Sequence, residues 1–163
     1  MIKKIGVVFI LFGFIISCIC YADGEELVFN NREINFRSGG VGSLNTAVEN
    51  MTALIDSEIG SYLECDINVT KTGKYDIYIE EKLYNSRGIY QFTVDGVDIG
   101  EPHDQYAAFE KANSRVFLGN KEFSTAGIKK FRFTVVDQNP ASTGFTLGFY
   151  NVILVPAEQS PVV

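Results

Sequence analysis

Apolar and polar residues alternate with a period of two through most of the chain after residue 60. Within residues 61–69, every second position from Leu63 to Val69 is apolar and the positions between them are polar. The same alternation recurs in residues 74–80, 90–94 and 130–135, and a last apolar segment runs from Phe145 to about Val155. This pattern predicts β-strands that bury one face and expose the other.

Turn-forming residues separate these segments at regular intervals. Thr72-Gly73, Ala126-Gly127 and Asn139-Pro140 each lie between two apolar segments, and Asp95-Gly96 lies between Val94 and Val97. An Asp-Gly pair between alternating segments is a strong signal for a two-residue β-hairpin. Many short strands at this spacing predict a single all-β domain, a β-sandwich of eight or nine strands from about Glu25 to Pro156.

Two segments do not follow the alternation. Residues 44–59 have apolar positions at helical spacing, but glycines crowd the start and the centre is a poor helix former, so we expect irregular chain and a short strand near Met51–Ile55. The acidic pair Glu80-Glu81 is interpreted as the charged exit of a strand. One of the two would face inward if the alternation continued, which favours a bulge there.

The first 22 residues have the features of a bacterial export signal. Lys3 and Lys4 precede an apolar segment from Ile5 to Ile16, which is too short to span a bilayer. Cleavage after Ala22 would release a free protein that begins at Asp23. Cleavage after Ser17 would instead produce a lipoprotein with a lipidated Cys18. The sequence therefore predicts a signal peptide over 1–22, one β-sandwich domain over 23–157 and a flexible tail over 158–163.

Net charge and cysteine content narrow the range of possible functions. Removal of residues 1–22 takes away two of the 14 basic residues and none of the 20 acidic ones, which leaves a formal net charge of −8. Such an acidic chain is not expected to bind nucleic acid or an anionic membrane surface, so membrane contact would depend on the lipid anchor alone. After cleavage at Ala22 only Cys65 remains, and its place on the apolar face of a strand predicts an unreactive core thiol.

The order of motifs from Gly60 to about Pro156 resembles carbohydrate-binding modules of families 6 and 35. A glycine-led strand over Gly60–Val69 is followed by the turn and strand Thr72–Ile77. The features after it are similar to galactose-binding-like domains attached to secreted polysaccharide-degrading enzymes. They are Gly88, Val94-Asp95-Gly96, Ile99–Tyr106, Leu118-Gly119, Ala126-Gly127, Asn139–Ser142 and Leu147-Gly148. The resemblance implies a galactose-binding-like jelly roll and a carbohydrate ligand.

The chain departs from this resemblance in two respects. These modules often hold a structural calcium with acidic residues of the first strand and an aspartate of the last, but here the first strand reads Leu27-Val28-Phe29 and Tyr150 occupies the aspartate position. We therefore expect no cofactor, and the departures argue against a structural calcium. Sugar-binding modules commonly stack pyranose rings on tryptophan, and this chain contains none, so tyrosine would take that part.

Candidate ligand-binding residues gather in three predicted loops. They are Tyr84, Arg87, His103, Asp104, Tyr106, Asn139 and Ser142. Each also has a structural interpretation: Asp104 could accept backbone N–H groups while Tyr106 packs beneath the loop, and Asn139 before proline is an ordinary turn former. Arg87 could grip the carboxylate of an acidic sugar or remain a solvated turn residue. His103, the only histidine, is expected to face solvent.

No nucleophile–base set, paired carboxylates or metal cluster stands out, so we expect no catalytic activity. The sequence favours a secreted or periplasmic binding module that holds carbohydrate weakly through loops at one end of the sandwich. The alternative is a structural or protein-interaction component of the cell envelope, whose partner would be an envelope protein. Eight phenylalanines of the predicted domain are expected in the core. They are Phe29, Phe36, Phe92, Phe117, Phe131, Phe133, Phe145 and Phe149.

The two cleavage sites predict two different mature proteins. Expression of the full chain in a bacterial host should yield a product without its first 17 or 22 residues, because the apolar segment is an export signal. Intact mass of the product distinguishes an N-terminus at Asp23 from a diacylglycerol adduct on Cys18. A product that retains Lys3 and Lys4 would contradict export with cleavage.

Overall fold

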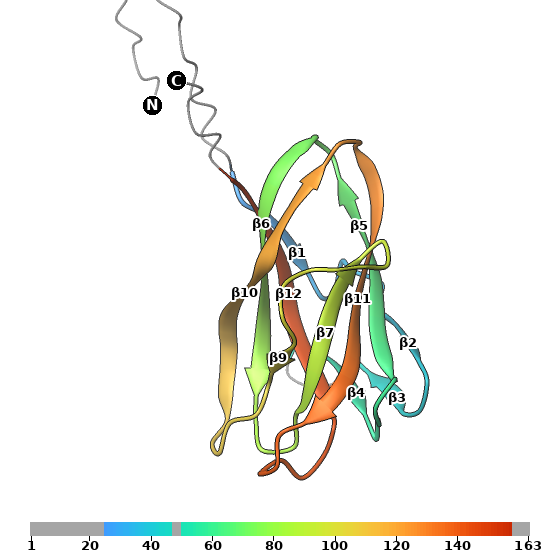
Figure 1. The fold of residues 1–163 in the computed structure, drawn as a ribbon, viewed down its shortest axis with the longest axis vertical. Helices are drawn as coiled ribbons and strands as arrows, with labels where there is room; N and C mark the ends of the chain where they lie inside the picture. The colour runs from blue at the N-terminus through green and yellow to red at the C-terminus, as the bar shows by residue number, and fades with distance from the viewer. Residues whose placement is uncertain (1–24, 47–49, 158–163) are drawn as a thin grey trace, which may run out of the picture.

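Two antiparallel six-stranded sheets pack face to face in the computed structural model, which describes residues 25–46 and 50–157 (Figure 1). One sheet, called the β12 sheet, has the order β10 (Lys111–Phe123), β6 (Gly73–Leu83), β12 (Leu147–Pro156), β4 (Thr52–Ile55) and β3 (Ser43–Asn45), and β1 (Leu27–Asn30) also pairs with β12. The other, called the β11 sheet, has the order β2 (Arg37–Gly39), β5 (Tyr62–Val69), β11 (Gly127–Gln138), β7 (Gly88–Val94) and β8 (Val97–Asp98), and β9 (His103–Asp104) pairs with β7.

The jelly-roll β-sandwich expected from the sequence is confirmed. Eight of the twelve strands have four or more residues, and the other four are short edge strands. β4 is the strand expected near Met51–Ile55, and the segment before it contributes β3 as well. The described residues contain no helix, and so no helix that could span a membrane. The predicted signal peptide, Cys18 and the predicted tail over 158–163 lie outside the described residues.

The Asp95-Gly96 turn confirms the predicted hairpin. Val94 pairs with Val97, and both turn residues have positive φ, 51° for Asp95 and 80° for Gly96. A type I′ turn requires positive φ at both central positions, which explains why this dipeptide closes the hairpin. Asp95 also joins the hairpin to β11, since its carboxylate accepts the Lys130 N–H at 2.8 Å.

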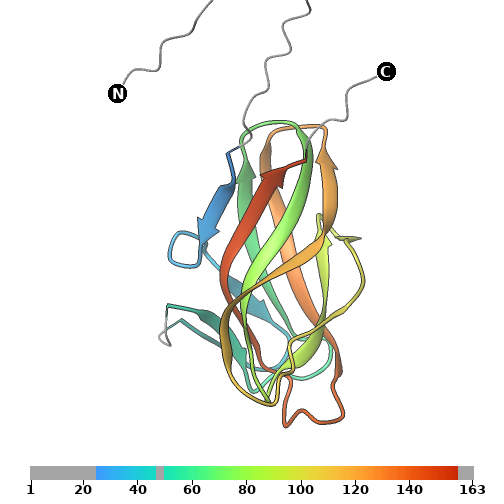
Figure 2. The same cartoon turned by 90° about the vertical axis from the view of Figure 1, so that its left-hand side faces the viewer.

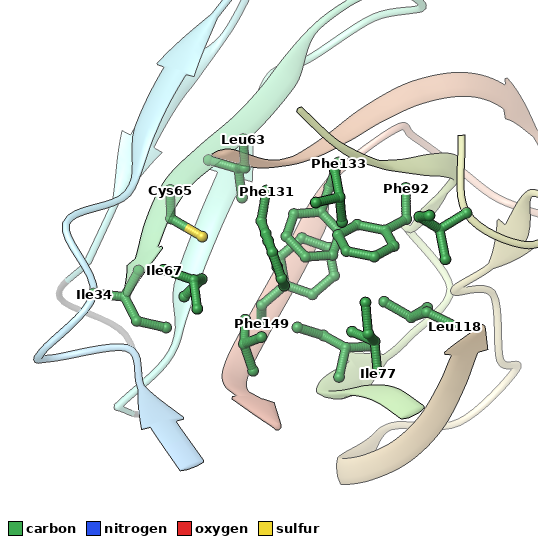
Figure 3. Packing of buried hydrophobic residues seen from close by; sticks show 14 of the residues in the cluster. Ile34, Leu63, Cys65, Ile67, Ile77, Phe92, Leu118, Phe131, Phe133 and Phe149 are labelled. Atoms are coloured by element: carbon green, nitrogen blue, oxygen red, sulfur yellow. The ribbon is translucent and has the colours of Figure 1, made fainter. Parts of the chain in front are cut away.

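Aromatic rings from the two sheets meet in the core. Phe133 of β11 lies 4.4 Å from Phe149 of β12 and 5.0 Å from Phe92 of β7, measured between ring centroids (Figure 3). Cys65 is buried in the same core as a free thiol, and burial raises the pKa of that thiol well above its usual value. The predicted core thiol is confirmed.

Phe117 is the exception among the eight predicted core phenylalanines. Five are buried, and Phe29 and Phe145 pack against the core partly exposed, but Phe117 is 52% exposed. Its neighbours Val116 and Leu118 contact the core, so alternation along β10 places Phe117 on the outer face. The prediction that it belongs to the core is therefore wrong.

Glu80-Glu81 is not the exit of a strand. β6 continues to Leu83, and Glu81 faces inward with its side chain fully buried. The irregularity lies in the partner strands: the pairing shifts between Phe149 and Asn151 of β12, and between Lys111 and Ser114 of β10. The alternation of β6 itself therefore holds.

Charged side chains cover the outer face of the β11 sheet. Arg132 donates to Glu64 at 2.8 Å, and Arg37 donates to Glu64 at 3.2 Å and to Asp66 at 2.9 Å. The Arg132 guanidinium also lies 4.1 Å from the ring centroid of Tyr62. Burial raises the pKa of Glu64, but hydrogen bonds from Arg132 and Arg37 outweigh it, so the pKa lies below its ordinary value.

Because of this network, we expect the unfolding free energy of the protein to decrease at acid pH. A carboxylate whose pKa is lower in the folded than in the unfolded chain stabilises the fold above the unfolded pKa of about 4.3, and that contribution disappears as the pH falls through the folded value. Glu64→Gln should therefore differ most from the wild type in unfolding free energy at about pH 6, and the difference should shrink below about pH 4. Urea titrations across this range measure it, and a difference that stays constant would contradict the prediction.

Candidate functional site

The fold brings all seven sequence-predicted residues to one end of the sandwich. They come from the β6–β7 turn, β9 and its following loop, and the β11–β12 loop, at the end opposite to the start of β1 and the end of β12 (Figure 1). Tyr84 and Tyr106 form a parallel β-bridge, and Asn139 donates to the Asp104 carboxylate at 2.6 Å. The candidate residues therefore lie close together in space, although they come from segments that are far apart in the sequence.

Most polar groups of this end-loop cluster already hold the loops together. Asp104 accepts the backbone N–H of Tyr106 at 2.8 Å with one oxygen and the Asn139 amide with the other. The Ser142 hydroxyl lies 2.7 Å from the Arg87 carbonyl oxygen. The Arg87 side chain is buried, with the residue only 4% exposed, and does not lie at the surface as a turn arginine would. The role of the cluster in ligand binding stays a prediction.

His103 belongs to a buried network and not to a solvent-facing loop. Its Nε2 lies 2.6 Å from a Glu81 oxygen, and its side chain is 28% exposed. The other Glu81 oxygen accepts the Tyr90 hydroxyl at 3.0 Å and the Gln105 amide at 2.8 Å. Burial and the charge of Glu81 raise the pKa of Tyr90 well above its usual value, so Tyr90 remains a donor. Gln105 also exchanges two hydrogen bonds with the backbone of Gly148.

A second candidate site lies on the outer face of the β12 sheet. A cavity of about 270 Å³ opens there, and most of its lining is polar. We call it the asparagine pocket, and its lining residues are Asn30, Asn31, Arg32, Asn50, Asn113, Tyr150 and Asn151. Figure 2 looks towards this side of the molecule, with β1, β12, β6 and β10 in front.

Turns and a bulge build the asparagine pocket. β1 ends at Asn30, whose carboxamide oxygen accepts the backbone N–H of Arg32 at 2.8 Å. The turn that follows β1 is anchored by Ile34, which is buried in the core. The Arg32 guanidinium donates to the Asn50 side chain. Asn50 and Asn113 have φ values of 58° and 50°, a left-handed conformation that asparagine adopts more readily than most residues. The sequence thus places asparagine where the backbone bends.

Carboxamides give the pocket a distinct chemistry. Each asparagine offers a carbonyl acceptor and two N–H donors without a net charge. The Asn151 carboxamide already makes one hydrogen bond, since it donates to the Glu80 carboxylate. The Arg32 guanidinium adds donors at the rim. A hydroxyl group both donates and accepts, so a ring of carboxamides matches a neutral molecule with many hydroxyl groups better than it matches a metal ion.

The sequence interpretation missed this pocket. None of its lining residues was among the candidates, because they come from four separate segments. One signal was present: Asn151 interrupts an otherwise apolar strand from Leu147 to Pro156, and Asn30-Asn31 ends another. A polar residue inside an apolar strand indicates either a bulge or a functional surface.

The residues do not fit a structural calcium of the kind that the sequence resemblance implies. Within residues 25–46 and 50–157, no group of three or more acidic, histidine or cysteine side chains could hold a metal ion. Tyr150, in the place of the expected aspartate, is buried and packs with Met51 and Ala53. Glu26, just before β1, is paired with Arg115 at 2.8 Å. A hard cation such as Ca²⁺ needs six or more oxygen ligands, several of them carboxylates.

No model of a known protein family matches the sequence, and no curated protein is significantly similar to it. Solved structures share its fold. A Paenibacillus xanthan lyase matches with a TM-score of 0.71 and 19% identity, over 80% of this chain and 13% of the lyase. A Podospora anserina GH26-CBM35 β-(1,4)-mannanase matches at 0.58 and 16%, over 85% of this chain and 29% of the enzyme. A CBM36 carbohydrate-binding module in complex with calcium and xylotriose matches at 0.52 and 12%, over 78% and 97%.

These matches confirm the resemblance at the level of fold. The chain has the jelly-roll β-sandwich found in carbohydrate-binding modules, and it spans only a small part of the lyase and of the mannanase.

The buried network predicts unequal effects for two tyrosine substitutions. Tyr90→Phe removes a donor to a carboxylate and should lower the unfolding free energy by about 1.5–3 kcal/mol. Tyr75→Phe is the matched control, since its buried hydroxyl donates to the neutral Lys71 carbonyl at 3.1 Å, and it should cost about 0.5–1.5 kcal/mol. Urea denaturation of both variants measures the difference. A Tyr75→Phe loss equal to or above that of Tyr90→Phe would contradict a special role for Glu81.

Proposed function

We propose that this protein is a non-catalytic carbohydrate-binding module whose ligand binds in the asparagine pocket. The observation that supports it is the lining itself: five asparagines, one tyrosine and one arginine around a cavity of about 270 Å³. Sugars present closely spaced hydroxyl groups and no charge, so carboxamides can satisfy them without the desolvation of a buried ion. The jelly-roll fold, shared with a module solved with xylotriose, is consistent with this proposal.

The pocket supports the proposal better than the end-loop cluster does. In the cluster, Asp104, Asn139 and Ser142 are committed to hydrogen bonds that hold the loops, and a ligand would have to displace them. In the pocket, Asn30, Asn50 and Asn151 also make hydrogen bonds, but an open cavity lies between them, and ladder pairing of β1 with β12 holds the backbone of Asn30 and Asn151. Protein side chains that are positioned on strands lose less conformational entropy when a ligand binds than side chains on loops do.

The absence of catalysis is part of the proposal. A glycosidase needs two carboxyl groups across a glycosidic bond, about 5–10 Å apart. The pocket lining contains no carboxyl group, and the Glu80 carboxylate beside it accepts a hydrogen bond from Asn151. The pocket therefore favours binding without cleavage.

Pocket variants test the proposal. The mature protein is titrated with soluble xylan, glucomannan and galactan and with their oligosaccharides by calorimetry, after a glycan-array screen. Asn31→Ala and Asn113→Gly should each weaken binding at least tenfold, a loss of about 1.4 kcal/mol, because each removes a carboxamide from the lining. Glycine at position 113 retains the left-handed backbone, so the fold should be preserved.

Two controls make the result specific. Asn120→Ala removes an exposed carboxamide from the same strand outside the pocket and should leave binding unchanged. Asn139→Ala alters the end-loop cluster. Binding lost with Asn139→Ala but retained with Asn31→Ala would move the site to the cluster. If no glycan binds and an envelope protein is captured from envelope extract, the carbohydrate proposal is wrong.

A further inference from the structure

Two rows of side chains cross the outer face of the β12 sheet beside the pocket. The first row runs through Asn30, Asn151, Glu80 and Arg115, which are register partners on β1, β12, β6 and β10. All four are polar, and the first two line the asparagine pocket. The strands that carry them lie side by side in Figure 2.

The second row lies two residues further along each strand and is apolar. It runs through Val28, Ile153, Tyr78 and Phe117, again in register. Side chains two residues apart on a strand share a face and lie about 7 Å apart. The outer face therefore carries a polar row and, parallel to it, an apolar row that we call the aromatic row because it contains Tyr78 and Phe117. Ile153 in this row is only 2% exposed, so the aromatic surface lies on β6 and β10.

Phe117 and Tyr78 form a fixed aromatic surface within the second row. Their ring centroids are 5.4 Å apart, with an angle of 55° between the planes. The Arg115 guanidinium lies 4.6 Å from the Tyr78 centroid and is held by Glu26, at 2.8 Å. Tyr78 is thus covered and oriented, whereas Phe117 keeps about half of its surface in contact with water.

We propose that Phe117 is a second subsite for the same ligand, so that the protein binds a neutral oligosaccharide that runs from the asparagine pocket across the sheet to the aromatic row. This inference rests on the proposed function. A sugar ring has an apolar face of C–H groups that stacks on an aromatic ring, and hydroxyl groups at its edge that suit the carboxamides. Asn113 and Phe117 are four residues apart on β10, at most about 13 Å in extended chain, so a ligand that reaches both must be longer than one sugar ring.

Two acidic side chains along the sheet disfavour an acidic chain there, and the pocket's own cation, Arg32, already donates to Asn50. Glu80 stands in the polar row, and Glu26 lies next to the aromatic row. The Arg115 guanidinium is committed to Glu26, and that hydrogen bond holds the pKa of the Glu26 carboxyl below its ordinary value. A carboxylate on the ligand would approach two acidic side chains and would compete with Glu26 for Arg115.

Varying the length of the oligosaccharide tests the second subsite separately from the pocket. Xylose, xylobiose, xylotriose and xylopentaose, with a matched mannose series, are titrated into the wild type and into Phe117→Ala. Wild-type affinity should rise with length. Phe117→Ala should weaken the binding of the longest oligomers about tenfold and leave the monosaccharide unchanged, because only a longer chain reaches Phe117.

Phe109→Ala is the matched control. Phe109 is 83% exposed in the loop between β9 and β10, outside the two rows, and its removal should leave binding unchanged at every length. Thermal unfolding of both variants checks that each remains folded. A uronic-acid oligomer of the same length should bind more weakly than the neutral one, and tighter binding would overturn the neutral preference.

The outcomes separate the inference from the function on which it rests. If Asn113→Gly abolishes binding while Phe117→Ala binds every oligomer like the wild type, the second subsite is wrong and the proposed function stands. If Phe117→Ala weakens all lengths equally, Phe117 is not a separate subsite. If no oligosaccharide binds the wild type, the proposed function fails and this inference with it.

Discussion

A carboxylate buried between the two sheets constrains one whole end of this protein. Glu81 is fully buried, and an ionised carboxyl group without partners would cost several kcal/mol there. Three partners satisfy it: Tyr90 from β7 and Gln105 just after β9 donate to one oxygen, and His103 Nε2 from β9 lies 2.6 Å from the other. Each partner comes from outside the β12 sheet to which Glu81 belongs. Burial of one acidic side chain therefore requires β9 and its loop to stay against the sandwich.

The constraint at Glu81 also limits where a ligand can bind. Side chains that resemble a binding site in sequence are used to hold this end closed, as Asp104 shows by accepting from both Tyr106 and Asn139. On the outer face of the β12 sheet, ladder pairing satisfies the backbone, and Asn30, Asn50 and Asn151 make local hydrogen bonds while they line an open pocket. Phe117 is held on the same face by β10 and remains about half exposed. The polar groups of the end-loop cluster thus hold the loops together, whereas those on the outer face of the β12 sheet line the candidate site.

The fold could be predicted because β5, β6, β7 and β11 alternate over most of their length, and an Asp-Gly turn closes its hairpin as the backbone angles require. The sequence interpretation did not recognise β10, the longest strand, since register shifts after Lys111 and Phe117 break its period of two. It placed Glu81 at a strand exit because the sequence does not show the three hydrogen-bonding partners that allow this carboxyl group to be buried. It gathered the end-loop residues correctly in space, but hydrogen bonds that consume their polar groups are not visible in a sequence.

The irregularities that concealed β10 are also those that shape the candidate site. The shift between Lys111 and Ser114 accompanies the left-handed backbone of Asn113 at the pocket wall, and regular pairing from Ser114 to Phe117 then places Arg115 and Phe117 on the same outer face. On β12, the shift between Phe149 and Asn151 lets Tyr150 and Asn151 both line the pocket, which strict alternation would forbid. Two register shifts, on β10 and on β12 at either side of β6, therefore convert a regular outer surface into a cavity with an aromatic row beside it. A sequence pattern that tests only for uninterrupted alternation overlooks this kind of site, because the interruption creates it.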